Sequence, residues 1–350
     1  MMGNNSEEVR VLIYGVGAIG SRIAKLILKK KGFKIVGAVD ISPDRKGKDL
    51  GEVIGISREL GVIVSEDAEE TLSSVRADVT VHATSSFFKT VYPQIANIVK
   101  HGVNVVSTCE ELAYPYIVDA SLAASLDSLA KKHGVTVLGT GINPGFLMDT
   151  LPIALSGVCQ EIESIRVERV IDAAKRRLPF QKKIGAGLSP QEFDEMIKKR
   201  RITGHVGLEQ SVSMIADALK LDLEEVKVEP VRPVIAEKPV ESREIKVEKG
   251  MVAGLTQTAY GLISGEPFIT LVFKAYIGAK EEYDSIIIEG TPRINQRITP
   301  CVHGDLATAA VVVNSIPKVI KAPPGLKTMK DLPVPSAVLG DVRRYLVDKS

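Results

Sequence analysis

A glycine-rich turn, Gly15 to Gly20, constrains the fold of this chain more than any other feature of its sequence. It reads Gly-Val-Gly-Ala-Ile-Gly, follows a β-branched run at Val9 to Tyr14, and precedes a helical pattern at Ser21 to Lys31. A strand, a GxGxxG turn and a helix in this order are typical of a dinucleotide-binding βαβ unit. The order therefore favours a nucleotide site over a glycine-rich turn without a ligand.

Each glycine of this turn has a mechanical role. Gly15 permits the tight turn, Gly17 lets the backbone approach a pyrophosphate, and Gly20 lets helix and strand touch. Ala18 and Ile19 lie in the turn that opens the helix, and unpaired backbone N–H groups at this helix N-terminus are expected to face the phosphates.

An acidic residue, Asp40, closes the second predicted strand at the spacing expected for this motif, about 20 residues after Gly20. Its carboxylate would accept hydrogen bonds from an adenosine ribose and repel a 2′-phosphate, which favours NAD. Arg45, Lys46 and Lys48 follow closely and could neutralise such a phosphate. Use of either NAD or NADP is therefore expected.

Short β-branched runs alternate with helical patterns as far as Leu138, which predicts βαβ units around a parallel sheet. The expected strands are Val9 to Tyr14, Lys34 to Val39, Val62 to Val64, Asp78 to Ala83, Val103 to Ser107 and Val135 to Leu138. The first region, residues 1–145, is therefore predicted to be a Rossmann-type, doubly wound domain of the α/β class.

The pattern changes after Phe146. Longer strands are expected there, at Ser164 to Val170, Ile269 to Ile277 and Ser285 to Glu289, together with a Pro/Glu/Lys-rich stretch from Glu224 to Lys249. This predicts a second α+β domain, residues 146–303, with a mostly antiparallel sheet. An apolar run at Leu306 to Ile316 is expected to form a helix that folds back on the first domain, so that residues 304–350 complete it. The stretch from Lys321 to Ser336 is rich in proline.

The charge balance argues against nucleic acid and membrane partners. The chain has 45 Lys and Arg against 43 Asp and Glu, a formal net charge of +2, so it carries no strong overall field for either polyanion. No apolar run reaches the roughly 18 residues that a membrane span needs. The three cysteines, Cys109, Cys159 and Cys301, lie far apart and form no disulfide framework. We therefore expect a cytoplasmic protein.

Polar loops follow the predicted parallel strands, at the sheet edge where open α/β sheets bind ligands. Thr84, Ser85 and Ser86 are expected to lie beside a nicotinamide. Asn143 belongs to Gly139 to Phe146, a segment too rich in turn formers for a regular element. We expect this segment to cross between the domains and to contribute Asn143 to the cofactor, although a plain hinge explains it equally well.

Adjacent carboxylates at Glu110 and Glu111 follow another strand, and only one of them can face the site. A glutamate desolvated beside a nicotinamide would have a raised pKa, suited to proton transfer near neutrality. The alternative is a solvent-facing pair that caps the next helix. Cys109 suggests a rival, an acylating aldehyde dehydrogenase with a thiolate nucleophile, but no histidine stands nearby in sequence to activate it. A half-buried structural cysteine is the preferred interpretation.

The five histidines lack metal-ligand spacing, so no catalytic metal is predicted. His205 lies between two glycines of a turn, Gly204 to Gly207, and alone would be read as a surface residue.

Two family resemblances cover the chain. The N-terminal half, with Val11 to Gly20, Ile35 to Asp40 and Gly47 to Glu52, resembles the nucleotide domain of dihydrodipicolinate reductases. The second half lacks the His-His pair and the Lys-x-x-x-Ser-Gly-Thr motif of those enzymes.

A closer similarity over nearly the whole chain is to the 2,4-diaminopentanoate dehydrogenases and the native amine dehydrogenases related to them. Five motifs carry it in one order, at Thr108 to Pro115, Gly139 to Asp149, Gly204 to Gly207, Met214 to Leu219 and Gly250 to Gly254. The resemblance implies NAD(P)-dependent oxidative deamination of 2,4-diaminopentanoate to 2-amino-4-oxopentanoate and ammonia, a step of ornithine fermentation. It also implies a homodimer formed through the second domain.

The same resemblance assigns residues to roles. The catalytic carboxylate is placed at Glu110, with Glu111 as the fallback. Arg169 and His205 are expected to bind the substrate carboxylate, and Phe146 is placed on the substrate side. Retention of Arg169 and His205 favours the diamino acid over simple ketones. The competing interpretations are a native amine dehydrogenase acting on simple ketones and amines, and a non-catalytic dinucleotide-binding sensor.

Overall fold

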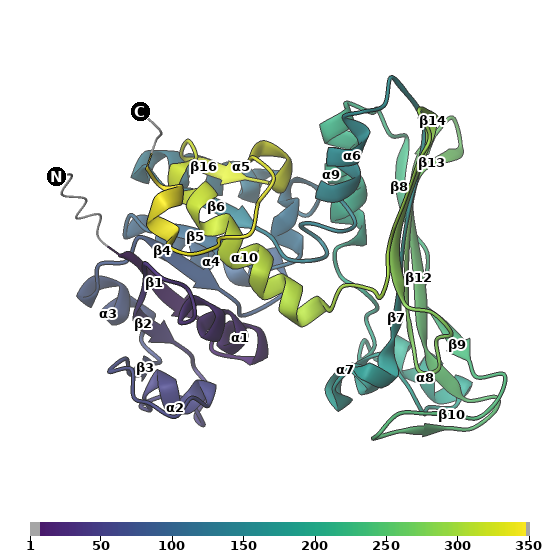
Figure 1. Cartoon of the computed structure of the whole chain (residues 1–350), viewed down its shortest axis with the longest axis horizontal. Coiled ribbons are helices and arrows are strands. Elements are labelled where there is room, and N and C mark those ends of the chain that lie inside the picture. Colours follow the sequence, from purple (N-terminus) through teal and green to yellow (C-terminus); the bar gives the residue numbers. More distant parts are fainter. Residues whose placement is uncertain (1–7, 348–350) are drawn as a thin grey trace. The chain divides into compact units, whose positions relative to one another are not determined.

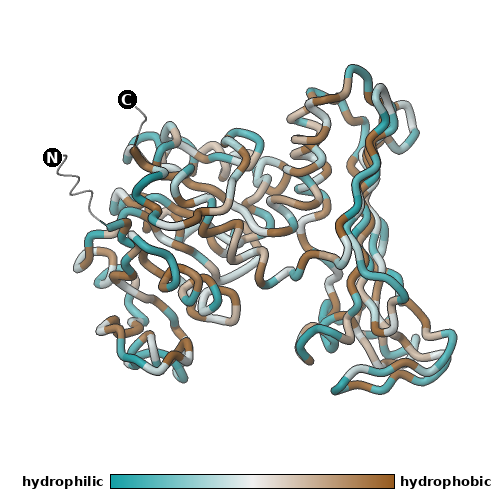
Figure 2. The backbone as a smooth tube through the Cα atoms, in the orientation of Figure 1, coloured by the Kyte–Doolittle hydropathy of each residue, from teal (hydrophilic) through white to brown (hydrophobic). Residues whose placement is uncertain are grey.

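The computed structural model describes residues 8–347, and the chain divides into two compact units (Figure 1). Unit 1 comprises Met1–Phe146 and Gly304–Ser350, and unit 2 comprises Leu147–His303. The first boundary lies one residue after the expected one, and the second lies between the same two residues as expected. Hydrophobic and hydrophilic segments alternate along both units (Figure 2), as expected for elements that each bury one face.

Unit 1 is built on a parallel sheet of seven strands in the order β16-β6-β5-β4-β1-β2-β3. The strands are β1 (Val9–Tyr14), β2 (Phe33–Val39), β3 (Val64–Ser65), β4 (Val79–His82), β5 (Asn104–Ser107), β6 (Thr136–Gly139) and β16 (Gly325–Lys327). The order reverses at β1, as in a dinucleotide-binding fold, and β1 leads directly into the glycine-rich turn. The predicted Rossmann-type α/β class is confirmed.

Helices cover both faces of this sheet (Figure 1). On one side, α1 (Ala18–Ile27) packs against α10 (Gly304–Lys321), which also contacts β5. On the other, α3 (Ala68–Ser74), α4 (Phe88–Lys100) and α5 (Ala120–His133) share one hydrophobic core with the strands. A short helix, α2 (Leu50–Ile54), contacts α1.

The C-terminal part of unit 1 has two features that the sequence pattern did not indicate, a longer helix α10 and the strand β16. The helix α10 continues through Pro317 to Lys321, beyond the expected end at Ile316. Within the proline-rich stretch that follows, β16 pairs in parallel with β6 and becomes an edge strand of the sheet. A strand of three residues is too short to show a period, so only its pairing partner identifies it.

Unit 2 contains a sheet ordered β15-β14-β7-β13-β12-β8, with β9 also paired to β12. Its strands are β7 (Glu161–Asp172), β8 (Glu225–Val228), β9 (Arg232–Ile235), β12 (Val252–Ile263), β13 (Glu266–Tyr276), β14 (Tyr283–Thr291) and β15 (Ile294–Ile298). All pairs are antiparallel except β13 with β7, so the sheet is mostly antiparallel as predicted. The separate hairpin β10 (Val240–Glu241) and β11 (Lys246–Val247) lies within the Pro/Glu/Lys-rich stretch.

The helices of unit 2 are α6 (Thr150–Ser156), α7 (Leu178–Lys183), α8 (Pro190–Lys198) and α9 (Leu208–Leu219). Helix α9 packs on β12 and β13, and α6 contacts α9. Short 3-10 helices lie at η1 (Glu111–Ala113), η2 (Pro115–Ile117), η3 (Ala173–Lys175), η4 (Met329–Asp331) and η5 (Val342–Tyr345). Between residues 8 and 347, none of the helices is both long and apolar enough to span a membrane.

Candidate functional site

The three glycines of the turn after β1 meet three different demands. Gly15 has φ +93°, and a Cβ on it would lie 2.4 Å from the Ala83 carbonyl oxygen. A Cβ on Gly20 would lie 1.8 Å from the Gly15 carbonyl oxygen, so helix and turn touch there. A Cβ on Gly17 would have no neighbour within 4 Å. The first and third glycines therefore serve the fold, and the middle one leaves the space that a phosphate would need.

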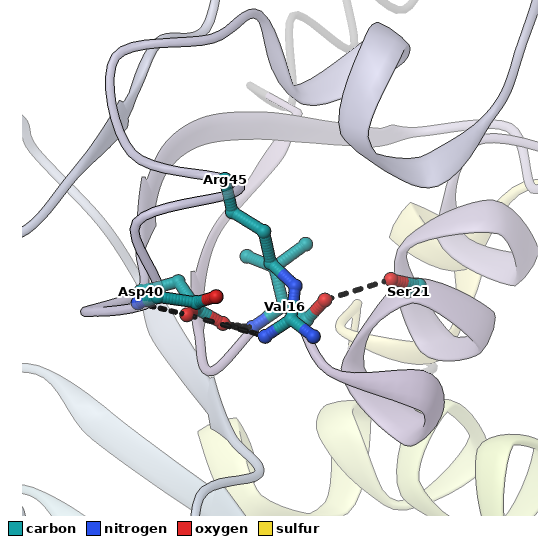
Figure 3. A network of polar contacts seen from close by, with 5 residues as sticks. Val16, Ser21, Asp40 and Arg45 are labelled. Atoms are coloured by element: carbon teal, nitrogen blue, oxygen red, sulfur yellow. Dashed lines mark hydrogen bonds and ion pairs between the residues drawn. The ribbon is translucent and has the colours of Figure 1, made fainter.

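The Asp40 carboxylate holds this turn in place from the end of β2 (Figure 3). Its Oδ2 accepts a hydrogen bond from Val16 N at 2.7 Å, and its Oδ1 accepts one from Ser42 N at 2.8 Å. Ser21 Oγ donates to the Val16 carbonyl at 2.9 Å, which fixes the turn to α1. Asp40 is thus a structural anchor of the nucleotide turn as well as the expected partner of a ribose.

Arg45 forms an ion pair with Asp40 (Figure 3). Its Nη1 lies 3.0 Å from Asp40 Oδ2 and 3.3 Å from Oδ1. The two lysines of the same segment point elsewhere, Lys46 to Glu66 at 2.8 Å and Lys48 to Glu52 at 3.3 Å. Of the three cations that the sequence offered for a 2′-phosphate, Arg45 is the one that pairs with Asp40, the residue expected to bind the ribose.

Other features of unit 1 fit a dinucleotide. Asn143 Oδ1 is buried and has no hydrogen-bond partner among the described residues, which suits an amide donor of a ligand. The N-terminus of α1, at Ala18 and Ile19, lies directly after the open position at Gly17. The residues present therefore fit a nicotinamide dinucleotide.

The loop after β4 is tied to the loop after β5. Thr84 Oγ1 donates to Gln94 Oε1 at 2.7 Å, and Ser85 Oγ accepts from Phe87 N at 3.3 Å. The carbonyl of Ser86 accepts a hydrogen bond from Glu111 N at 3.1 Å. Of the three residues expected beside a nicotinamide, Ser86 thus connects the loop after β4 to the Glu-Glu segment.

The two adjacent glutamates have different surroundings. Glu111 begins η1, and its Oε2 accepts a hydrogen bond from Phe88 N, the first residue of α4, at 2.6 Å. The N-cap residue Phe87 supplies no side-chain cap, so Glu111 satisfies an amide that the helix itself leaves open. Glu110 precedes η1 and is half-buried. The sequence allowed for a glutamate pair that caps the next helix, whereas Glu111 satisfies the N-terminus of α4, which lies earlier in the chain.

A row of side chains crosses the inner face of the unit 2 sheet. Gln257, Phe273, Arg169 and Asp284 occupy matching register positions on β12, β13, β7 and β14. The His205 ring stacks on Phe273, with centroids 4.5 Å apart and planes 9° apart. His205 N donates to Gln257 Oε1 at 2.9 Å. The histidine that the sequence placed in a surface turn therefore lies against the sheet.

His205 carries an unused polar atom. Its Nε2 is buried and has no hydrogen-bond partner among the described residues. Burial, reinforced by the positive charges of Lys183 and Arg169, lowers the pKa of His205 to about 3. A neutral imidazole with one free ring nitrogen is suited to a polar ligand group.

Arg169 is already engaged within unit 2. Its Nη1 donates to Asp284 Oδ1 at 2.9 Å, and its Nη2 donates to the Val302 carbonyl. Asp284 Oδ2 accepts in turn from Val302 N at 2.7 Å. The expectation of an arginine free for a bidentate contact with the substrate carboxylate is corrected accordingly, because the residue is 1% exposed and its guanidinium neutralises a buried carboxylate.

Comparison with known proteins identifies the family. Residues 146–348 match the 2,4-diaminopentanoate dehydrogenase C-terminal domain, and residues 9–112 match the N-terminus of dihydrodipicolinate reductase. The chain is 37% identical to the 2,4-diaminopentanoate dehydrogenase of Acetoanaerobium sticklandii, over 98% of this chain and 99% of that protein. This chain belongs to the 2,4-diaminopentanoate dehydrogenase family.

Two further relatives extend the likeness to amine dehydrogenases. An amine dehydrogenase of Streptomyces virginiae is 24% identical over 94% of this chain and 98% of that protein. The structure of an amine dehydrogenase from Mycobacterium smegmatis matches with a TM-score of 0.80 and 30% identity, over 94% of this chain and 97% of that one. The resemblance stated from the motifs is confirmed. The chain is an oxidoreductase of the amine dehydrogenase type, with a nicotinamide cofactor.

Cys109 does not serve as a nucleophile in this member of the dehydrogenase family. The residue is 1% exposed, and burial raises the pKa of its thiol to about 12. A thiol with this pKa holds almost no thiolate near neutral pH. The rival interpretation of an acylating aldehyde dehydrogenase is therefore wrong, and the structural interpretation of Cys109 is supported.

The sequence did not single out two polar residues of the dehydrogenase's unit 2, Gln257 and Asp284. Both lie at inward register positions of strands, next to positions filled by apolar side chains. A polar residue that interrupts a buried apolar alternation was the available signal.

Phe146 ends unit 1 and is half-buried. Over residues 8–347, no three His, Cys, Asp or Glu side chains gather as a metal site.

Proposed function

We propose that the protein oxidises the C4 amine of 2,4-diaminopentanoate to 2-amino-4-oxopentanoate and ammonia, with NAD+ or NADP+ as hydride acceptor and water as the oxygen source. The observation that carries this proposal is the pairing of a nucleotide turn with a glutamate loop on the same sheet edge, in a chain 37% identical to a 2,4-diaminopentanoate dehydrogenase. The reverse reaction is the reductive amination of the ketone.

Glu110 is the proposed acid–base residue. The reaction must remove a proton from the substrate ammonium, later take one from water, and return one to the departing ammonia, so one carboxylate has to cycle a proton. Glu111 Oε2 accepts from Phe88 N and so has a structural role, and the family resemblance places the catalytic carboxylate at Glu110. A nicotinamide cofactor held by unit 1 would supply the acceptor for the hydride from C4.

The cofactor is proposed to be either NAD or NADP. Gly15, Gly17 and Gly20 are proposed to shape the turn that binds the pyrophosphate, and Asp40 is proposed to bind the ribose; the open position at Gly17 and the contact of Asp40 with Val16 N support this. Arg45 can break its ion pair with Asp40 and pair with a 2′-phosphate instead, because only the Arg45 side chain has to rotate. Thr84, Ser85, Ser86 and Asn143 are proposed to surround the nicotinamide end, because they follow β4 and β6 at the sheet edge that binds ligands.

We propose that His205 binds a polar group of the substrate through its unused Nε2. Phe146 is kept as a proposed apolar contact. Arg169 is assigned a supporting role, in which its charge lies near the bound carboxylate while its hydrogen bonds stay with Asp284 and Val302. This arrangement suits an amino acid better than an uncharged ketone, because a neutral substrate would gain nothing from the arginine.

A homodimer is proposed through the outer face of the unit 2 sheet. Gly261 faces α9, since a Cβ there would lie 3.0 Å from Val212. The alternate residues Thr256, Thr258 and Tyr260 therefore point the other way, and they are only half-buried. A second copy of the chain would cover this face. Sedimentation of the purified protein tests it, and Tyr260→Lys should shift a dimer toward monomer.

The function is tested by following reduced nicotinamide spectrophotometrically. Purified protein is mixed with NAD+ or NADP+ at mildly alkaline pH and offered 2,4-diaminopentanoate or a panel of simple amines. Turnover of the diamino acid alone supports the proposal and places the enzyme in ornithine breakdown. Preference for simple amines would identify a native amine dehydrogenase, and bound cofactor with no turnover would identify a sensor.

We propose the cytoplasm as the compartment, since Cys109, Cys159 and Cys301 are all free thiols.

A further inference from the structure

Four residues form a row at the end of the unit 1 sheet. Tyr14, His82, Ser107 and Gly139 are the last residues of β1, β4, β5 and β6, and each is paired with its neighbour in the register of the parallel strands. The Tyr14 and His82 rings lie 5.4 Å apart. This row is the final layer of the sheet before the loop that carries Glu110.

His82 and Ser107 are connected by a directed series of hydrogen bonds. His82 Nε2 donates to Gln94 Oε1 at 2.8 Å, because the amide oxygen can only accept. The ring nitrogen Nδ1 is then the acceptor for the Ser107 hydroxyl at 2.9 Å. Ser107 Oγ in turn accepts from Cys109 N at 3.1 Å. Every link has one donor and one acceptor, so the series ends on the backbone of the residue before Glu110.

The imidazole is set to keep this direction. His82 is fully buried, and burial lowers its pKa to about 4. A neutral ring at neutral pH carries one proton, which Gln94 Oε1 holds on Nε2. The hydrogen bond with Gln94 acts in the opposite direction and raises this pKa, but the effect of burial is larger.

Gly139 packs against the other end of the same loop. A Cβ at this position would lie 2.4 Å from the Leu112 carbonyl carbon and oxygen and 2.6 Å from Ala113 N. Only a glycine lets the backbone of η1 rest directly on β6. The loop is therefore fixed on the row at two places, Cys109 on one side of Glu110 and Leu112 on the other.

We propose that His82, Ser107 and Gly139 are positioning residues that hold the Glu110 carboxylate at the reacting amine. The inference rests on the proposed catalytic role of Glu110. These residues need not touch substrate or cofactor. They act by fixing the two backbone segments between which Glu110 lies, and a displacement of about 1 Å at a catalytic group can lower the rate about a hundredfold.

The decisive variant is Ser107→Ala, which removes the hydroxyl from both His82 Nδ1 and Cys109 N. We expect kcat for the amine to fall about tenfold to a hundredfold, while the Kd of NADH by fluorescence titration changes by less than about twofold. The matched control Ser107→Thr keeps a hydroxyl and should recover most of kcat. His82→Asn, which keeps an acceptor near the Nδ1 position, should retain more activity than His82→Leu.

Equal losses in Ser107→Ala and Ser107→Thr, an unchanged kcat in Ser107→Ala, or a parallel loss of cofactor affinity would each overturn the proposal. A second readout needs no turnover. Hydrogen exchange of the peptide covering Thr108 to Ala113 should be faster in Ser107→Ala than in the natural protein, with other peptides unchanged. Unchanged exchange there refutes the positioning role. A natural protein that oxidises no amine refutes only the proposed function, because the exchange experiment still reports on the loop.

Discussion

The carboxylate of Glu111 accepts a hydrogen bond from the backbone N–H of Phe88 at 2.6 Å. Through this contact, one of two adjacent glutamates caps the N-terminus of α4, where the helix dipole favours a negative charge. Its neighbour Glu110 lies one residue earlier, directly before η1. The contact therefore gives one of two chemically identical side chains a structural role, while proton transfer is proposed for the other.

This separation predicts the effect of charge removal at each site. Glu110→Gln should lower kcat at least about a hundredfold, within the range of general acid–base catalysis, with little change in cofactor affinity. Glu111→Gln is the matched control, because its amide oxygen can still accept from Phe88 N and activity should largely persist. Steady-state kinetics of both variants provide the measurement. A greater loss in Glu111→Gln would reverse the assignment.

The ion pair of Asp40 with Arg45 predicts opposite changes in cofactor preference. Arg45→Ala should weaken NADP+ binding about tenfold or more, since a charge-assisted contact with the 2′-phosphate is lost. The same change should leave NAD+ binding equal or tighter, because Asp40 is released for the ribose. Asp40→Ala should weaken NAD+ much more than NADP+. Titration with both cofactors measures this, and equal changes for both would place Arg45 away from the ribose.

Gly17 and Gly20 should respond differently to a single methyl group. Gly17→Ala adds an atom in open space, so stability should be preserved while cofactor affinity falls about tenfold or more through obstruction of the pyrophosphate. Gly20→Ala forces a Cβ against the Gly15 carbonyl oxygen, so stability should drop by about 1–3 kcal/mol. Thermal unfolding and cofactor titration separate the two effects. Loss of stability in Gly17→Ala would contradict the role assigned to that position.

Stability should decline in mild acid because of His82. Its pKa is lowered from 6.5 to about 4 in the folded protein, so between these values the unfolded chain binds a proton that the folded one does not. The free energy of unfolding should therefore fall as the pH drops from about 6.5 toward 4, by up to about 3 kcal/mol from this group. Denaturant unfolding measured across this range provides the test. His82→Asn should have a flatter pH profile, and an unchanged slope would show that His82 is not the titrating group.

Arg169 and Asp284 should behave as a coupled pair. Arg169→Met leaves Asp284 buried without its cation and should destabilise the protein by roughly 3–5 kcal/mol. The double variant Arg169→Met with Asp284→Leu removes both charges and should recover much of that loss. Chemical denaturation of the single and double variants measures the coupling. A stable Arg169→Met variant with a raised KM for the diamino acid would instead return Arg169 to direct substrate binding.

Much of unit 1 could be predicted from the sequence because its signals are local. The glycine turn, the strand before it and the helix after it are adjacent along the chain, and Asp40 follows at a fixed spacing. The loops at Thr84 and Glu110 could be placed for the same reason, since each directly follows a buried parallel strand. Local periodicity also separated the parallel region from the mostly antiparallel one.

Contacts between distant residues were decided only by the tertiary structure. Glu111 meets an amide 23 residues away, and Arg169 meets a carboxylate 115 residues away. Neither partner has a pattern that marks it in the sequence, because register and packing bring such groups together. The sequence alone thus determined the nucleotide-binding fold and the segment proposed to carry the chemistry. That Glu111 caps α4, and that Arg169 is bound to Asp284, depended on how the folded chain satisfies its buried polar groups.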